Sequence, residues 1–225
     1  LQLGSILAIL FYFKKDLKSI YRGFKSILRH RNVNYDFESR LTSSIFIGTI
    51  PILIIGFFIK FFWQDYESSP LRSITSIGLV SIFMSIILAL AELKGARKKT
   101  LNSLVPFDGF KIGLAQVFAL LPGASRSGVT LSASLLNGWD RESSARYSFL
   151  LGLPSITIAG FVELSSMFNI SNFHLIPLFL GILSSSISSW FAIDFLLRYL
   201  RRNNTWLFIN YRLVFGVVLI SYSLL

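Results

Sequence analysis

The sequence contains no cysteine and only two histidines, His30 and His174, among its 225 residues. The absence of cysteine excludes a disulfide framework and a thiolate metal site, and two histidines cannot form a multi-histidine metal centre. Charged residues are also scarce. They make up 15% of the chain, whereas about a quarter is usual in soluble domains. So little charge excludes an ordinary water-soluble fold.

The chain is instead rich in long apolar runs, and 53% of it is hydrophobic, with 22 phenylalanines. A run of about 20 apolar residues crosses the bilayer core as a helix. The sequence predicts such spans at 41–63, 73–93, 149–167, 175–197 and 207–225, and 1–13 is typical of the rear part of another. We therefore expect an all-α polytopic membrane protein with about six transmembrane helices, in which 1–225 is a single membrane domain.

Basic residues outnumber acidic ones by 22 to 11, and the formal net charge is +11. A basic soluble protein would suggest nucleic acid as a partner. Here Lys and Arg cluster between the apolar runs, which is the positive-inside pattern of membrane proteins. The sequence therefore predicts a bilayer, and no nucleic acid, as the partner. The loops predicted to be cytoplasmic are 14–40, 94–103 and 198–206, and those predicted to lie outside are 64–72 and 168–174.

The middle of the chain does not fit a simple series of spans. Segment 140–148 must be cytoplasmic like loop 94–103, because the span that follows it ends outside. The stretch between them has two apolar arms, 112–121 and 129–139, each about half a spanning length. The sequence therefore predicts a re-entrant helical hairpin over 104–139, whose polar tip lies at membrane depth inside protein or a water-filled cavity.

One hairpin followed by three spans, 149–225, forms a complete unit. The three spans of 1–93 would form the first repeat, which lacks its hairpin. An odd number of spans makes successive units inverted, and inverted repeats whose broken helices meet near the midplane are a known membrane architecture. We therefore expect an inverted-repeat arrangement.

The hairpin tip, residues 122–128, combines backbone features that suit an anion. Gly123 and Gly128 adopt backbone conformations that other residues resist. Successive N–H groups can then converge as an anion nest, and the second arm points its helix N-terminus at the same place. The tip is therefore a candidate phosphate site. The alternative is that its small residues only permit close helix packing.

The side chains of the tip carry matching chemistry. Arg126 supplies a permanent, fork-shaped cation that suits phosphate oxygens, and an arginine at membrane depth usually marks a functional site. Ser125, Ser127 and Thr130 add hydroxyl donors. The alternative for Arg126 is an ordinary arginine at the membrane interface.

Three further residues have open interpretations. Gln116 on the first arm would face the site or form a helix–helix hydrogen bond. Arg212, six residues into the last span, would reach phosphate or snorkel to the interface. Glu92 closes a span beside Lys94 and Arg97, and we expect it to be solvated.

Segment 14–31 carries apolar residues at helical spacing among its lysines and arginines. This pattern predicts an amphipathic helix on the cytoplasmic membrane face, and a helix that docks a protein is the alternative.

The run ALLPGASRSGVT at 119–130 resembles the second signature of the undecaprenyl-diphosphate phosphatase family, the bacitracin-resistance membrane phosphatases. Residues 2–8, the FLLGLP run at 149–154 and the pair Tyr211-Arg212 also resemble stretches of that family. The resemblance covers essentially the whole chain.

Membership would imply hydrolysis of undecaprenyl diphosphate to undecaprenyl phosphate and inorganic phosphate, which recycles the lipid carrier for peptidoglycan synthesis. The protein would lie in the bacterial cytoplasmic membrane with its active site facing outward. By the resemblance, Arg126 would neutralise the diphosphate, and Ser125, Ser127 and Thr130 would bind phosphate oxygens, with one serine as a candidate nucleophile. Gly123, Gly128, Gln116 and Arg212 would complete the substrate site.

The family's first signature, a glutamate-rich hairpin thought to bind a divalent metal, does not occur in this sequence and is expected before Leu1. The ligands of a Mg²⁺ or Ca²⁺ ion would lie there. We also expect a homodimer. The alternative function is a transporter or flippase of a phosphorylated polyprenyl lipid, because inverted repeats and a midplane anion site suit transport as well.

Overall fold

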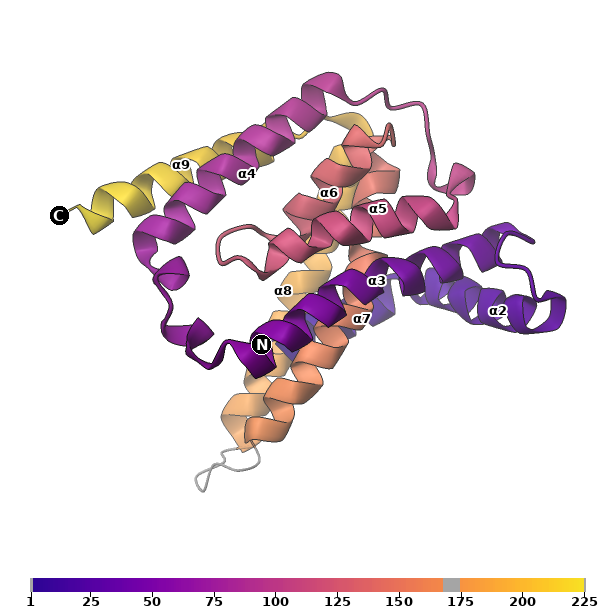
Figure 1. Ribbon diagram of the computed structural model, residues 1–225, viewed down its shortest axis with the longest axis horizontal. Coiled ribbons are helices and arrows are strands. Elements are labelled where there is room, and N and C mark those ends of the chain that lie inside the picture. The colour runs from indigo at the N-terminus through magenta and orange to yellow at the C-terminus, as the bar shows by residue number, and fades with distance from the viewer. Residues whose placement is uncertain (1, 168–174, 225) are drawn as a thin grey trace.

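The computed structural model describes residues 2–167 and 175–224, and within them nearly all regular structure is helical (Figure 1). The α-helices are α1 (Gln2–Tyr12), α2 (Lys14–His30), α3 (Phe37–Phe62), α4 (Ile74–Lys94), α5 (Pro106–Gln116), α6 (Arg126–Leu136), α7 (Arg141–Met167), α8 (Leu175–Arg202) and α9 (Trp206–Ser223). Short 3-10 turns lie at Gln64–Ser68, Pro70–Arg72, Leu101–Ser103 and Val117–Leu120. The predicted outer loop 168–174, with His174, lies outside the described residues.

Five of the described helices are long and apolar enough to cross a membrane, namely α3, α4, α7, α8 and α9. Helix α1 is apolar but has only 11 residues, which is shorter than a bilayer crossing. The prediction of an all-α polytopic membrane protein is therefore confirmed. The division into inverted repeats stays a prediction.

Small residues let the helix backbones approach closely, as is usual between membrane helices. A Cβ atom on Gly113 of α5 would lie 2.0 Å from the carbonyl oxygen of Gly48 in α3. Helices α4 and α9 run side by side (Figure 1), and a Cβ atom on Gly216 would lie 2.8 Å from the carbonyl oxygen of Gly78. These four glycines therefore serve helix packing.

The two arms of the predicted hairpin are α5 and α6, which contact each other and leave the tip at one end (Figure 1). Their other ends meet. The side-chain amide of Asn137 donates to Asp108 over 2.7 Å, and the backbone N–H of Lys99 donates to the carbonyl of Gly138 over 2.9 Å. The chain thus leaves and returns at one place, which is the geometry that a re-entrant hairpin requires. The depth of its tip in a bilayer stays a prediction.

The structure extends the span predicted at 149–167 toward the N-terminus, into the segment 140–148 that we expected on the cytoplasmic side. Helix α7 already begins at Arg141. The carboxylate of Asp140 accepts hydrogen bonds from the backbone N–H of Ser143 over 2.8 Å and from its hydroxyl over 2.7 Å. Such a cap satisfies the first amides of a helix, so α7 extends two turns beyond its apolar run.

Candidate functional site

The hairpin tip is a sharp turn that ends in the N-terminus of α6. Gly123 has a φ of 88° and Ser125 a φ of 60°, a backbone region that favours glycine. The hydroxyl of Ser125 accepts a hydrogen bond of 3.3 Å from the N–H of Gly128 and so caps α6. The amides of Arg126 and Ser127 begin the helix and therefore have no intrahelical acceptor. The tip thus presents free N–H groups together with the positive end of a helix dipole.

A cavity of about 280 Å³ lies beside this tip, between α4, α6, α7 and α9. Its polar lining comes from the tip, α4, α7 and α9, and the remaining walls are largely apolar. The residues that line it are Ser81, Leu88, Gly123, Ser125, Ser127, Gly128, Leu131, Ala145, Ser148, Phe149, Leu196, Phe208, Tyr211, Arg212 and Phe215. An apolar cavity with a few convergent polar groups is typical of a ligand site.

Arg212 reaches this cavity from α9. Its Nη2 donates to the carbonyl oxygen of Gly123 over 2.8 Å. A Cβ atom on Gly128 would lie 2.6 Å from its Nη1, so glycine at 128 leaves room for the guanidinium. Arg212 therefore points at the tip, and its depth relative to the membrane surface stays a prediction.

Arg126 points to the other side of the tip. Its Nη1 donates to the carbonyl oxygen of Gly152 in α7 over 3.0 Å. It lines a second cavity of about 550 Å³ formed with α1, α7 and α8. The two cavities share Phe149, Leu196 and Phe208 as walls and therefore adjoin. The tip thus has one guanidinium on each side.

The three predicted hydroxyls have different surroundings. Ser125 and Ser127 are exposed and line the first cavity, with their oxygens 3.5 Å apart. Thr130 is fully buried. Its hydroxyl donates to the carbonyl of Arg126 over 2.9 Å and contacts the hydroxyl of Ser148. The hydroxyl of Ser125 caps α6 but engages no carbonyl, so its proton and the hydroxyl of Ser127 can contact a ligand, whereas Thr130 is committed to the base of α6.

Gln116 does not line the cavity beside the tip. Its side chain is fully buried, and neither amide atom has a hydrogen-bond partner among the described residues. The helix–helix hydrogen bond considered for it is therefore not present. Its role in substrate binding stays a prediction.

Sequence reasoning did not place Ser148 beside the tip, and it noted Gly152 only as part of the FLLGLP run at 149–154. Both residues lie on α7. Ser148 contacts the hydroxyl of Thr130 in α6 through its own hydroxyl, and Gly152 accepts a hydrogen bond from Arg126 through its carbonyl. Small residues within a span indicate close helix packing, but only the fold shows which helix they pack against.

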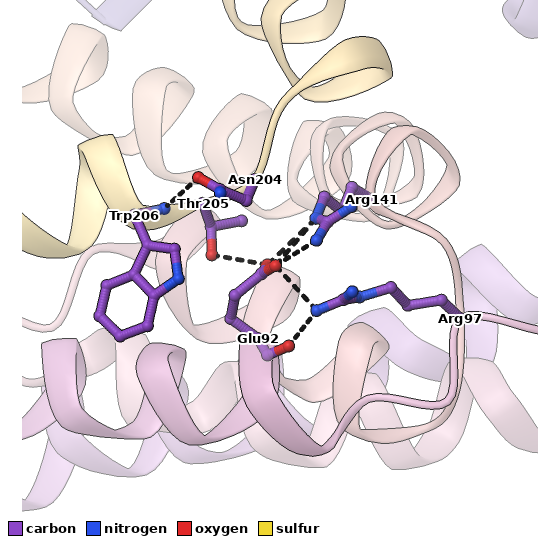
Figure 2. Close-up of polar contacts among 6 residues, drawn as sticks. All are labelled: Glu92, Arg97, Arg141, Asn204, Thr205 and Trp206. Carbon is purple, nitrogen blue, oxygen red and sulfur yellow. Dashed lines mark hydrogen bonds and ion pairs between the residues drawn. The ribbon is translucent and has the colours of Figure 1, made fainter.

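The expectation that Glu92 is solvated is wrong. Its side chain is only 3% exposed and is surrounded by three donors (Figure 2). Arg97 Nη2 lies 2.8 Å from its Oε1, the Nε of Arg141 donates over 3.1 Å, and Thr205 Oγ1 donates over 2.9 Å. The loop after α4 folds back and the start of α7 lies against it, which together cover this helix end.

A divalent metal would need several carboxylate or imidazole ligands in one place. No group of three Asp, Glu or His side chains that could hold a metal ion occurs among the described residues. The hydroxyls, amides and guanidinium groups around the tip suit an anion and not a cation. The described part of the chain therefore does not itself fit a metal.

The sequence is similar to known proteins over nearly its whole length. The family model described as bacitracin resistance protein BacA matches residues 1–218. An undecaprenyl-diphosphatase of Synechococcus sp. (strain RCC307) is 51% identical over 222 residues, which cover 98% of this chain and 77% of the relative. A protein of the same name from Prochlorococcus marinus (strain MIT 9303) is 50% identical over 225 residues, which cover 100% of this chain and 76% of the relative.

The match with the family model includes the hairpin tip, both arginines beside it, four of the long apolar helices and α9 as far as residue 218. The identity to the two curated relatives is about half over 222 and 225 residues. The chain therefore belongs to the bacitracin resistance protein BacA family.

Proposed function

We propose that this chain hydrolyses undecaprenyl diphosphate to undecaprenyl phosphate and inorganic phosphate, and so recycles the lipid carrier for peptidoglycan synthesis. The observation that carries the proposal is the identity of about 50% over essentially the whole chain to relatives named undecaprenyl-diphosphatase. The anion-binding tip beside an apolar cavity supports it independently.

In this reaction water adds to the terminal phosphorus, and the bond from that phosphorus to the bridging oxygen breaks. The lipid phosphate leaves with the bridging oxygen, and a proton is released. Phosphoryl transfer is accelerated mostly by positioning and by stabilising charge on the phosphoryl oxygens. The chain's residues that would do this are Arg126 and Arg212, with the free amides that begin α6.

Ser125 and Ser127 are the hydroxyls that would contact the phosphate oxygens, because they line the cavity and no helix carbonyl engages them in the way that Thr130 is engaged. One of them would be the nucleophile if the reaction proceeds through a phosphoserine. In that route the serine oxygen would bond to the terminal phosphorus while the bond to the bridging oxygen breaks, which releases undecaprenyl phosphate and the hydroxyl proton. Water would then add to the phosphorus while the bond to the serine oxygen breaks, which releases inorganic phosphate and restores the hydroxyl.

The polyprenyl tail would lie along the apolar cavity walls, among them Leu131, Phe149 and Phe215. These walls belong to helices that can span the bilayer, so the tail need not leave an apolar environment while its headgroup reaches the tip. The protein would be a multi-pass component of the bacterial cytoplasmic membrane with this site open to the outer side.

Two further expectations belong to the proposal. A divalent cation, Mg²⁺ or Ca²⁺, would assist the reaction, although the described residues offer no ligand set for it and no step above depends on it. A homodimer is the expected assembly, and light scattering of the detergent-solubilised protein would measure its mass.

The direct test is release of inorganic phosphate from undecaprenyl diphosphate by the purified full chain in detergent. A hydrolase works without two compartments, whereas a transporter of phosphorylated lipid requires sealed vesicles. The variant Arg126→Lys keeps the charge but loses the fork geometry, and we expect a large fall in phosphate release. Lipid crossing in vesicles without phosphate release, or unchanged turnover of Arg126→Lys, would contradict the proposal.

A further inference from the structure

Helix α2 is docked on the rest of the protein by one face only. A Cβ atom on Gly23 would lie 2.1 Å from the carbonyl oxygen of Glu38 in α3, so the two backbones nearly touch. The hydroxyl of Thr42 donates to the carbonyl of Ile20 over 2.9 Å. Asp16, the only acidic residue of α2, is buried and ion-paired with Arg146 over 2.7 Å. The one carboxylate of α2 is therefore neutralised on the face that packs against the protein.

A second face of α2 exposes large apolar side chains. Tyr21 is 59%, Phe24 48% and Leu28 65% exposed. Residues three, four and seven apart share one side of a helix, so these three side chains form one apolar stripe. An exposed apolar stripe on a helix calls for an apolar environment that the described chain does not supply.

A third face of α2, next to this stripe, carries only positive charge. Its exposed cations are Lys14, Lys15, Lys18, Lys25 and Arg29. None of these five forms an ion pair with a carboxylate in the part of the chain that the structure describes. Arg22 differs, because it pairs with Glu38 over 3.1 Å. Surface helices of soluble proteins usually intersperse acids among their bases, whereas this face presents a single sign.

The exposed residues of α2 follow exposed apolar residues of α1 along the chain, across one non-helical residue, Phe13 (φ −95°, ψ 23°). Leu7 and Phe11 of α1 are 39% and 70% exposed. At spacings of three or four residues they are followed by Lys14, Lys18, Tyr21, Lys25 and Leu28, all exposed. The apolar surface thus passes into a mixed basic and apolar surface where the chain leaves α1. This order matches the change from acyl chains to headgroups across a bilayer boundary.

We propose that α2 is an interfacial helix that binds the anionic lipid headgroups of the leaflet on the cytoplasmic side. Tyr21, Phe24 and Leu28 would enter the boundary between headgroups and acyl chains, and the lysines would contact lipid phosphates. The exposed apolar residues Leu7 and Phe11, which immediately precede α2 in the chain, favour a lipid surface over an acidic protein, because a protein partner would have to compete with the adjoining bilayer. The inference is independent of the hydrolase function.

The absence of cysteine makes a depth measurement straightforward. The full chain with Leu28→Cys carries one nitroxide label and is placed in nanodiscs of phosphatidylcholine, with or without about a quarter of phosphatidylglycerol. Collisions with oxygen report burial in lipid, and collisions with a water-soluble nickel complex report exposure to water. We expect phosphatidylglycerol to lower the nickel accessibility of the label several-fold and to raise its oxygen accessibility.

The test variant adds Lys14→Gln, Lys18→Gln and Lys25→Gln. Because each lysine near an anionic surface strengthens association about fivefold, the effect of phosphatidylglycerol should disappear. The matched control, Lys94→Gln, Lys98→Gln and Arg202→Gln, removes the same charge at exposed positions off α2 and should retain the effect. Thermal melting in detergent checks that both variants are folded.

The proposal is overturned if the nickel complex reaches the label equally in both kinds of nanodisc. It is also overturned if the label is equally protected in both kinds of nanodisc and remains so in the lysine variant. A control variant that loses the phosphatidylglycerol effect as fully as the test variant would overturn it as well. Added polyglutamate tests the alternative of an acidic protein partner. If polyglutamate protected the label and phosphatidylglycerol did not, the lipid proposal would be refuted.

Discussion

The guanidinium of Arg212 donates a hydrogen bond of 2.8 Å to the carbonyl oxygen of Gly123, a residue 89 positions earlier in the chain. This contact fastens the last helix, α9, to the tip of the hairpin. It also places a permanent cation next to the exposed hydroxyls of Ser125 and Ser127. Together with Arg126, on the opposite side of the tip, Arg212 can surround a diphosphate with positive charge.

We expect Arg212→Lys to lower turnover of undecaprenyl diphosphate by about a hundredfold, as is usual when one positioned donor to a transition state is lost. Lysine keeps the charge but cannot bind the Gly123 carbonyl and a phosphate oxygen with one planar fork. Phosphate release from the purified protein measures this. The control Arg202→Lys changes an exposed arginine at the end of α8 and should have no effect. Equal turnover in the two variants would contradict the assignment.

Gly152→Ala tests the position of Arg126. A Cβ atom at 152 would lie 2.9 Å from the Cζ and Nε atoms of Arg126. The guanidinium is the mobile end of a flexible side chain, so it should move while the helix stays intact. Alanine also favours helix over glycine by about 1 kcal/mol. We therefore expect kcat to fall by about a hundredfold, with a melting temperature that is unchanged or higher.

The matched control for this prediction is Gly56→Ala in α3, where the nearest side-chain atom would be 3.8 Å from the new Cβ. Its turnover should stay close to that of the original protein, and its melting temperature should be unchanged or higher, because alanine favours the helix here too. If Gly152→Ala lowered the melting temperature and turnover together, the glycine would serve packing and not the placement of Arg126.

Local features of this fold were predictable, and contacts between distant segments were not. The apolar runs predicted α3, α4, α7, α8 and α9 because lipid imposes length and hydrophobicity on each helix separately. The tip chemistry was also local, since Ser125, Arg126 and Ser127 are consecutive.

The bond from Arg212 to Gly123 and the burial of Glu92 depend instead on how α9 and α7 pack against the rest. Periodicity and charge patterns carry no information about such pairs. Helix starts were uncertain for a related reason: the cap at Asp140 overrides the polar character of the first two turns of α7.

Glu92→Gln should destabilise the protein strongly. The carboxylate joins the end of α4, the loop with Arg97, the start of α7 and the residue before α9 (Figure 2). Loss of the carboxylate leaves the guanidinium groups of Arg97 and Arg141, whose side chains are 34% and 24% exposed, without this buried partner. Losing hydrogen bonds to a charged group costs about 1.5–3 kcal/mol in other proteins. We expect a fall of that size in the free energy of unfolding in mixed detergent micelles. Glu38→Gln breaks the exposed pair with Arg22 and should cost about 0–1 kcal/mol, so equal losses would refute the buried role.

Asp36, in the loop between α2 and α3, should make stability depend on pH in the acid range. Partial burial alone would raise its pKa. The carboxylate accepts hydrogen bonds from the backbone N–H of Ser39 over 2.6 Å and from the hydroxyl of Ser26 over 2.8 Å, and His30 lies nearby. These interactions hold the pKa of Asp36 below its ordinary value. A carboxylate with a lowered pKa adds stability that is complete above its unfolded pKa of about 3.9 and is lost as the pH falls through the folded pKa.

The variant Asp36→Asn can still cap α3 but does not titrate. We therefore expect the original protein to exceed Asp36→Asn in unfolding free energy at pH values above about 5, with the difference shrinking below about pH 4. A difference that stayed constant down to low pH would show that the charge of Asp36 contributes nothing beyond its role as a cap.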